Sequence, residues 1–463
     1  MPYVRSTLPL IAILLAACQA GPPAATPKMP DSVAPGMSAS ASPYSAVGYD
    51  APAPLGWAKT KGGQGGQIIK VTTLAADGPG SLKAAIDAKG PRTIVFEVGG
   101  VIDLGAKTLT IREPFVTIAG QTAPSPGITL IRGGIDLIAH DAIIQHIRVR
   151  TGTAGGSWRK GPEFDAFSTQ GGAYNVVVDH CSFSWATDEN MSASGPRFTG
   201  ATPDEWRKGA SHDITFANNI AAEGLAYAVH PKGEHSKGSL IHDNTSNILI
   251  YGNLYAHNYE RNPLFKGGVR GTIVNNFIFD PGQRAMHYNL MANEWAGYAP
   301  QVGRMTVVGN VLRGGISTAE GIRFMMIGGV GDLEYHGRDN LMVDRWGKKL
   351  EELGSYGATT ARIIPSSKPL DWPDGLAAMP ANQVETYVLL HAGARPWDRD
   401  HDDIRIIADA AEGRGEIIDK EDQTGGYPVQ PPTHRTFDAS RWTVDMSPKD
   451  ASVLDGSAKS KGT

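Results

Sequence analysis

The chain has 463 residues, enough for one large domain or two ordinary ones. Its 43 Lys and Arg residues nearly balance its 47 Asp and Glu residues, and the formal net charge of −4 provides no general attraction to nucleic acid. The 56 glycines, with many Asn, Thr, Val and Ile residues, indicate short strands and tight turns rather than helices.

The first residues resemble a targeting segment. Arg5 supplies a positive charge, and the apolar stretch 8–15 is too short to span a bilayer. The Leu-Ala-Ala-Cys that follows resembles the lipobox of bacterial lipoproteins, which implies a signal peptide of residues 1–17 and lipidation of Cys18. An ordinary secretory signal cleaved near Ala20 is the alternative. Either way we expect an extracytoplasmic protein, as a lipoprotein of the outer membrane or periplasm, or secreted.

Residues 18–55 are rich in Pro, Ala, Ser and Gly and lack an apolar period, so they predict a flexible tether. Such a spacer suits an anchored domain that must reach a substrate away from the membrane. Once Cys18 is processed, Cys181 is the one ordinary thiol, which excludes an intrachain disulfide. Cys181 occupies an apolar column, and we expect it in the core.

Short strands follow in chain order. They are predicted at residues 68–71, 93–96, 116–118, 128–131, 135–138 and 143–149. Ser81 is placed to cap a short helix over residues 82–88, in which Leu82, Ala85 and Ile86 share one face.

A repeated pattern then begins with NVVVDHCSF at Asn175. It returns as ITFANNIAA, ILIYGNLYA, TIVNNFIF and MTVVGNVL, each with alternating apolar residues followed by a polar one. We assign this polar position to His180, Asn219, Asn253, Asn276 and Asn310. A recurrence roughly every 20–40 residues is typical of a solenoid.

This repeat predicts an all-β fold, a single-stranded right-handed parallel β-helix over residues 56–345. One coil cannot bury its apolar face alone, whereas stacked coils form a continuous core. The inward Asn side chains would hydrogen-bond from coil to coil, and we interpret His180 as structural for the same reason. A β-sandwich, the alternative, would show hairpin signals and turns every 8–12 residues or so.

The repeat is expected to stop near Arg345, and residues 346–463 then form a partly helical extension that packs on the solenoid or caps it. One helix is predicted over 380–392, with Gly393 as its stop. Asp402 or Asp403 is expected to cap a second helix that ends at Gly413. The last 20 residues or so are expected to be loosely ordered.

Carboxylates lie on both sides of the central strand. Glu163 and Asp165 are two residues apart and would face the same way on an extended segment, while Asp188 and Glu189 follow the strand. Stacked coils would bring the two groups together, and Ca²⁺ would relieve their repulsion through oxygen coordination. A solvated acidic loop that pairs with the basic residues at 159 and 160 would give the same pattern.

Basic residues follow in two clusters. The first contains His230, Lys232, His235 and Lys237, and the second contains His257, Arg261 and Lys266. Next to a cation site they would suit a polyanionic sugar chain. Alternatively, Arg261 pairs with Glu260 or with an acid of a neighbouring coil.

Five motifs now resemble one family. VTTLAADGPGSLKAAI, VTIAGQTAP, VVVDHCSFSWATDE, SKGSLI and ERNPLFKGG, in this order, resemble the pectate lyases, which are secreted parallel β-helix enzymes. The resemblance covers roughly residues 62–345. HAGARPWDRDHDD resembles the tail of bacterial members and extends it to about Pro428.

The resemblance implies roles for individual residues. Glu163, Asp165 and Asp188 match calcium-binding acids, but the fourth acid position carries Ser192, so either Glu189 substitutes or the ion binds only with substrate. Lys237 matches a lysine that contacts the substrate carboxylate, and Arg261 matches the catalytic arginine. Lys266 stands where a second substrate-binding arginine is usual, and we add His235 to the substrate-binding residues.

The implied reaction is calcium-assisted β-elimination on (1→4)-linked galacturonan, which yields 4,5-unsaturated oligogalacturonides. Arg261 would remove the C5 proton, while Ca²⁺ and Lys237 would stabilise the enolate. Because arginine is normally protonated, His257 or His235 is the alternative base.

Two other functions stay open. One is a polygalacturonase-like hydrolase that uses Asp165, Asp188 and Glu189 as its carboxyl groups. The other is a non-catalytic glycan-binding solenoid. In each case we expect a monomer that binds acidic polysaccharide, touches the membrane only through its lipid anchor and binds no nucleic acid.

Overall fold

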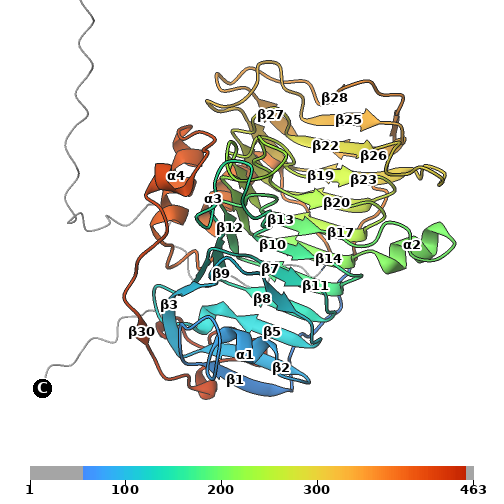
Figure 1. The fold of residues 1–463 in the computed structure, drawn as a ribbon. Helices are drawn as coiled ribbons and strands as arrows, with labels where there is room; N and C mark the ends of the chain where they lie inside the picture. The colour runs from blue at the N-terminus through green and yellow to red at the C-terminus, as the bar shows by residue number, and fades with distance from the viewer. Residues whose placement is uncertain (1–48, 50–55, 455–463) are drawn as a thin grey trace, which may run out of the picture. The chain divides into compact units, whose positions relative to one another are not determined.

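The computed structural model describes residue 49 and residues 56–454, and its strands stack into three parallel sheets (Figure 1). Each coil contributes one strand to each sheet in turn, and that strand pairs in parallel with its counterpart in the next coil. The one antiparallel pair among the named strands joins β3 to β30. The architecture is a right-handed parallel β-helix, as the repeat predicted.

The first sheet has 11 strands, which are β1 (Gln67–Val71), β2 (Arg92–Phe96), β5 (Val116–Ala119), β8 (Ala142–Gln145), β11 (Tyr174–Asp179), β14 (His212–Ala217), β17 (Ser246–Tyr251), β20 (Arg270–Val274), β23 (Gly303–Val308), β26 (Leu333–Arg338) and β29 (Ile363–Pro365). The second has 10 strands, which are β3 (Val98–Asp103), β6 (Ile128–Ile131), β9 (Ile147–Arg150), β12 (Ser182–Ser184), β15 (Ile220–Ala222), β18 (Leu254–Ala256), β21 (Phe277–Phe279), β24 (Val311–Arg313), β27 (Leu341–Val343) and β30 (Thr433–His434). The third has 9 strands, which are β4 (Leu109–Ile111), β7 (Ile135–Leu137), β10 (Phe167–Thr169), β13 (Met191–Ala193), β16 (Leu240–Ile241), β19 (Leu264–Lys266), β22 (Met286–Leu290), β25 (Met325–Gly329) and β28 (Leu353–Ser355).

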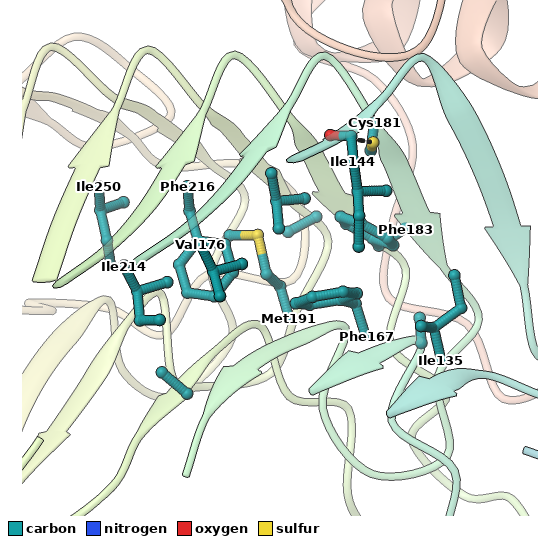
Figure 2. Close-up of a cluster of buried hydrophobic side chains, with 14 of the residues drawn as sticks. Ile135, Ile144, Phe167, Val176, Cys181, Phe183, Met191, Ile214, Phe216 and Ile250 are labelled. Atoms are coloured by element: carbon teal, nitrogen blue, oxygen red, sulfur yellow. Dashed lines mark hydrogen bonds between the residues drawn. The ribbon is translucent and has the colours of Figure 1, made fainter. Parts of the chain in front are cut away.

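The core runs along the inside of the coils. Figure 2 shows Val176, Ile214 and Phe216 from the first sheet beside Phe183 from the second and Met191 from the third. Burying one such side chain stabilises the fold by about 1.5–3 kcal/mol. Cys181 is buried among them as predicted, and its thiol donates to the carbonyl oxygen of Ile144 at 3.7 Å (Figure 2).

The predicted asparagine column is confirmed. The backbone N–H of Asn219 donates to the side-chain oxygen of Asn253 at 2.8 Å, that of Asn253 to Asn276 at 2.9 Å, and that of Asn276 to Asn310 at 2.9 Å. Asn310 continues the column to Asn340 at 3.0 Å. The column satisfies amides that would otherwise be costly to bury.

The assignment of His180 to this column is wrong by one residue. The backbone N–H of Cys181 donates to the side-chain oxygen of Asn219 at 2.8 Å, so Cys181 heads the column. His180 matches Asn218 instead, because both have left-handed backbones, with φ of 51° and 52°. His180 stacks on His146 and contacts Asp179 at 2.7 Å, so it is structural for another reason.

The short helix α1 (Leu82–Ile86) confirms the predicted cap, since the Ser81 hydroxyl accepts from the backbone N–H of Ala84 at 3.2 Å. It ends two residues earlier than predicted. The single strand predicted at 143–149 is two strands, β8 and β9, because the left-handed His146 between them turns the chain into the second sheet. The remaining short helices are α2 (Pro203–Gly209), η1 (Gly120–Thr122), η2 (Glu421–Thr424), η3 (Ala439–Arg441) and η4 (Ala451–Val453).

Helices α3 (Ala381–His391) and α4 (His401–Glu412) pack against the second sheet (Figure 1). Val384 and Ile406 are buried there with Leu254 and Phe277. The predicted cap of α4 is wrong, because Asp400 fills that position and accepts from the N–H of Asp403 at 2.9 Å.

Two expectations for the C-terminal part also need correction. The coils do not stop at Arg345, since β28 and β29 extend the third and first sheets. The chain from Phe437 to Leu454 is not loose, because its apolar side chains pack on the first coils around Val95 and Ala119. Both segments lack the repeat that identified the earlier coils.

The signal peptide (1–17), Cys18 and the tether apart from Tyr49 lie outside the described residues. Within the described part, no helix has the length and apolar character needed to cross a membrane.

Candidate active site

The predicted site lies at one edge of the third sheet. Asp165 precedes β10, Glu189 precedes β13, Lys237 precedes β16 and Arg261 precedes β19. Parallel strands about 4.8 Å apart place such residues side by side on successive coils. Isolated bridges join Glu189 to Lys237 and Lys237 to Glu260, which confirms the alignment.

A glycine permits the close approach of the two coils that carry the cations. A Cβ atom on Gly238 would lie 2.4 Å from the carbonyl oxygen of Arg261. The N–H of Gly238 donates to the carbonyl oxygen of Glu260 at 3.1 Å. Gly238 therefore fixes the separation between Lys237 and Arg261.

Three carboxylates meet at this edge. Asp165, Asp188 and Glu189 each offer an oxygen within 4.8 Å of the others. One oxygen of Asp165 also accepts from the backbone N–H of Glu189 at 2.9 Å. Burial, and then the charge of Asp188, raise the pKa of Asp165 well above its ordinary value. Crowded oxygen donors of this kind fit a hard divalent cation, which would relieve their repulsion.

Two histidines hold Asp188. Nε2 of His235 lies 2.5 Å from its carboxylate, and Nε2 of His230 lies 3.7 Å from the same oxygen and 3.1 Å from Glu163. The two imidazole rings stack with centroids 3.7 Å apart. Burial would raise the pKa of Asp188, but the nearby imidazoles of His230 and His235 outweigh it, and the pKa lies below its ordinary value. Glu163 thus reaches the acids through His230.

The cations form a chain of alternating charge with two glutamates. Arg261 pairs with Glu189, Lys237 pairs with Glu260 at 2.6 Å, and Arg284 pairs with the other oxygen of Glu260. Burial lowers the pKa of Arg261. Burial, and then the charge of Arg284, lower the pKa of Lys237 to about 7, while Glu260 favours its charged form. Arg261 thus pairs with an acid of another coil, although Glu189 lies two coils before it, with the coil of Lys237 between them.

Sequence reasoning named Glu260 only as a possible partner of Arg261, and it missed Arg284 and Tyr356 as parts of this edge. Arg284 is the counterpart of Arg261 one coil later, because β19 and β22 pair Leu264 with His287. Its guanidinium lies over the ring of Tyr356, 4.7 Å from the centroid. The recurrence of Arg just before two successive strands of the third sheet was the available signal. No such signal marked Tyr356 in the sequence, since it reaches the site from a late coil.

A groove of about 360 Å³ crosses the third sheet from this edge. Its lining residues are Asp188, Glu189, Lys232, Leu240, His242, Arg261, Leu264, Lys266, Asn289, Met291 and Glu294. Lys266 stands on the far side, where it contacts Glu294 and lies 3.5 Å from Asp243. The groove therefore joins an acid to cations, as the predicted site requires, whereas Glu163, His235 and Lys237 stand behind its lining.

Two remaining predicted residues are buried. His257, the alternative base, holds Asp280 at 2.9 Å and does not line the groove. Ser192 lies in β13 beside Ser168 of β10, so this position offers a hydroxyl where a carboxylate was expected. The Ser192 hydroxyl has no hydrogen-bond partner among residues 56–454.

Comparison with known proteins identifies relatives over most of the chain. Probable pectate lyase C of Neosartorya fischeri is 32% identical over 372 residues, which cover 79% of this chain and 78% of that protein. Probable pectate lyase C of Aspergillus fumigatus is 31% identical with the same coverage. No protein-family model matches the chain.

Solved structures share the fold. Jun a 1, the major allergen from cedar pollen, superimposes with a TM-score of 0.51 at 14% identity, covering 73% of this chain and 91% of its own. A mutant of Bacillus subtilis pectate lyase superimposes with a TM-score of 0.50 at 14% identity, covering 74% and 96%. With its β-helix, its charged groove and curated relatives above 30% identity over more than three quarters of their length, the chain belongs to the pectate lyase family of polysaccharide lyases.

Proposed function

We propose that the protein cleaves (1→4)-linked galacturonan by β-elimination and releases 4,5-unsaturated oligogalacturonides. The observation that supports this most is the groove itself, in which Asp188, Arg261 and Lys266 face one space. A polyuronate needs cations for its carboxylates, and an elimination needs a base beside them. The curated relatives carry the name probable pectate lyase C.

Lys266 and Lys237 would bind uronate carboxylates. Both already hold an internal carboxylate, since Lys266 pairs with Glu294 and Lys237 with Glu260. A substrate carboxylate can take the place of either glutamate without leaving a buried charge unpaired. The glutamates thus orient the lysines before substrate arrives.

Arg261 would be the base that takes the C5 proton. Its Nε–H is buried without a hydrogen-bond partner among the described residues, and burial lowers its pKa. Glu189 opposes proton loss, because an ion pair favours the charged guanidinium. Arg261 therefore has to leave Glu189 and lose one proton to solvent before it can accept the C5 proton.

Asp165, Asp188 and Glu189 would hold Ca²⁺, with Glu163 next to them through His230. When bound, the cation supplies positive charge that stabilises the carboxylate side of the developing enolate. The missing acid at Ser192 leaves three protein carboxylates at this position, and we propose that Glu189 replaces the fourth. The loss of Glu189 to the cation would also release Arg261.

We extend the proposal to the setting of the enzyme. A lipid anchor on Cys18 and a tether ahead of the coils would place a monomeric lyase outside the cytoplasm. Labelling with a radioactive fatty acid tests the anchor, since Cys18→Ser should abolish incorporation.

The reaction is tested with residues 56–463 on polygalacturonate. We expect a rise in ultraviolet absorbance from the unsaturated product, and its loss when a chelator removes divalent ions, with recovery on addition of Ca²⁺. New saturated reducing ends without this absorbance would show a hydrolase instead. Activity that persists in excess chelator would remove the cation from the mechanism.

Arg261→Lys tests the base. We expect kcat to fall by more than tenfold, because lysine cannot reproduce the guanidinium geometry, while the unfolding midpoint changes little. Arg304→Lys is the matched control, since Arg304 lies on the first sheet in a partly exposed ion pair with Glu334 at 2.8 Å. Equal turnover of the two variants would disqualify Arg261.

A further inference from the structure

A second hollow lies apart from the groove, between late turns of the coils and the end of α4. It has a volume of about 450 Å³ and is lined by Arg313, Gly314, Gly315, Ile316, Arg345, Trp346, Ala411, Glu412 and Gly413. None of these residues lines the groove of the candidate active site. The proposed reaction gives this hollow no role.

Exposed apolar side chains mark its rim. Trp346 is 74% exposed and Ile316 is 53% exposed. Large aromatic residues are usually well buried, so an indole this open to solvent is informative. Ordinary packing does not account for it, because none of the apolar clusters of the described core includes Trp346.

The turn that carries Trp346 is firmly built. Residues 343–349 form a hairpin closed by a bridge between Val343 and Lys349. One carboxylate oxygen of Asp344 accepts the backbone N–H groups of Trp346 and Lys348, each at 2.9 Å. This arrangement holds the backbone of the turn with the indole in solvent, which lowers the entropy lost when a ligand binds.

Two arginines supply positive charge beside the indole. The guanidinium of Arg345 lies over the Trp346 ring, 4.8 Å from its centroid, and has no hydrogen bond or ion pair to any described residue. Arg313 donates one Nη to Glu385 at 2.6 Å, while its buried Nε and other Nη lie over the rings of Phe277 and Phe279 without a hydrogen-bond partner among residues 56–454. Arg345 therefore offers the guanidinium that is suited to a ligand carboxylate, and Arg313 adds positive charge beside it.

The opposite wall supplies acceptors. The end of α4 at Glu412 and Gly413 presents carbonyl groups that have no partner within the helix. Glu412 is the one carboxylate of the lining, and it pairs with Arg414 at 2.9 Å. An inorganic anion would meet repulsion here. A sugar acid fits better, since its hydroxyls donate to this wall while its carboxylate accepts from the arginines.

We propose that this hollow is a second, non-catalytic binding site for an acidic oligosaccharide, with Trp346 against a sugar ring, Arg345 on its carboxylate and Arg313 adding positive charge to the wall. The choice of ligand rests on the proposed polyuronate substrate. Such a site would hold one part of a polymer while the groove acts on another, which raises the effective concentration of cleavable chain.

Calorimetric titration of trigalacturonate into the full chain carrying Arg261→Lys tests the site. We expect two binding events. Trp346→Ala or Arg345→Gln should weaken one of them by about tenfold or more, as expected for an anchoring aromatic or arginine, so that it is no longer detected. Lys237→Gln added to Arg261→Lys should impair the other event. Phe115→Ala, which truncates an aromatic side chain 41% exposed elsewhere, is the control and should change neither.

In the otherwise unaltered enzyme, Trp346→Ala should leave kcat/KM on trigalacturonate unchanged and raise KM on long polygalacturonate. Binding that is identical with and without Trp346 would overturn the site, whatever the activity. If Trp346→Ala removes a binding event but no unsaturated product ever forms, the proposed function fails and the site stands. A change of oligomeric state on Trp346→Ala, without a change in sugar binding, would make the hairpin a protein interface and overturn the proposal.

Discussion

Asp165 and Asp188 show how the same type of side chain is tuned in opposite directions at one site. Burial and the charge of its neighbour raise the pKa of Asp165, whereas the imidazoles of His230 and His235 bring the pKa of Asp188 down despite its burial. The environment, not the residue type, sets the charge. Ionisation of Asp165 therefore costs the fold more than ionisation of Asp188 does.

Asp165→Asn should stabilise the cation-free protein near neutral pH. An acid with a raised folded pKa binds more protons in the fold than in the unfolded chain, so the free energy of unfolding falls as pH rises from about 3.9 towards the folded pKa. The amide removes this loss. Thermal unfolding of both proteins from pH 4 to 8 should show a smaller decline for the variant.

The same substitution should weaken Ca²⁺ binding, because it removes one oxygen charge from the three. Asp141→Asn serves as the comparison, because Asp141 is a partly buried aspartate in the turn directly before strand β8 of the first sheet. If the stability of wild type and of Asp165→Asn changed equally with pH, Asp165 would not be an acid with a raised folded pKa.

Arg284 should control the pH at which Lys237 loses its proton. After burial, the charge of Arg284 contributes most to lowering the pKa of Lys237 to about 7. Arg284→Gln should therefore raise this pKa and move the fall of kcat/KM at high pH upwards, if Lys237 binds substrate as a cation. If kcat/KM were lower at every pH but still fell at the same high pH, Arg284 would contact substrate without setting the pKa of Lys237.

Residue by residue, the predicted site residues that the structure brings together are those that carry a local motif. Asp165, Asp188, Lys237 and Arg261 each stand beside a strand with a recognisable pattern. Arg284 and Tyr356 were not predicted, since their place at this edge comes from contacts with other coils. His180 was misplaced because a polar residue after an apolar run does not reveal which residue makes the left-handed turn.

Helix α4 docks on the second sheet through charge as well as apolar contact. Asp403 accepts from Arg148 at 3.1 Å and from Arg150 at 2.6 Å, and all three side chains are inaccessible to solvent. Removing one partner from a buried pair leaves the other charges uncompensated. Without α4, the buried charges of the two arginines would lack Asp403 as a partner, so the coils depend on this helix for their stability.

Asp403→Ala should destabilise the protein by about 3–5 kcal/mol, as expected for a broken buried ion pair. Unfolding in guanidinium chloride measures the change. Glu412→Ala, in the same helix but largely exposed, is the control and should change stability by less than about 0.5 kcal/mol. A small effect of Asp403→Ala would mean that Asp400 alone compensates the arginines.

At the level of elements, the predicted strands were found because each is a short apolar run bounded by a turn residue. The boundary between β8 and β9 was missed, since the turn at His146 takes a single residue and leaves the apolar pattern almost unbroken. The N-cap of α4 was misread because three aspartates compete for it, and burial decides that Asp403 turns to the arginines.

For the whole molecule, stacking of like coils explains both the fold and the site. Equivalent positions on successive coils lie one strand spacing apart. Charged side chains therefore line up along one edge of the third sheet, and asparagines line up in one inner column. The repeat in the sequence was sufficient to predict this architecture. It could not predict the late coils or the docked C-terminal chain, which lack the pattern.

The C-terminal strand β30 pairs antiparallel with β3 at the end of the second sheet, and Thr433 also donates to the carbonyl oxygen of Ser125 at 2.6 Å. A chain that ends at residue 432 should expose this edge and the apolar surface around Val95. We expect it to associate in light scattering, and a peptide of residues 430–454 should suppress the association. A truncated chain that stays monomeric would show that the edge needs no cover.

This closure sets the order in which an exported chain can fold. Coils can stack in the order in which they emerge, since each pairs with the one before it. The open side of the second sheet at β3, which is among the first to emerge, stays uncovered until Thr433 has followed. The time for which one emerging chain can pair with another is therefore set by the passage of the more than three hundred residues that separate β3 from β30.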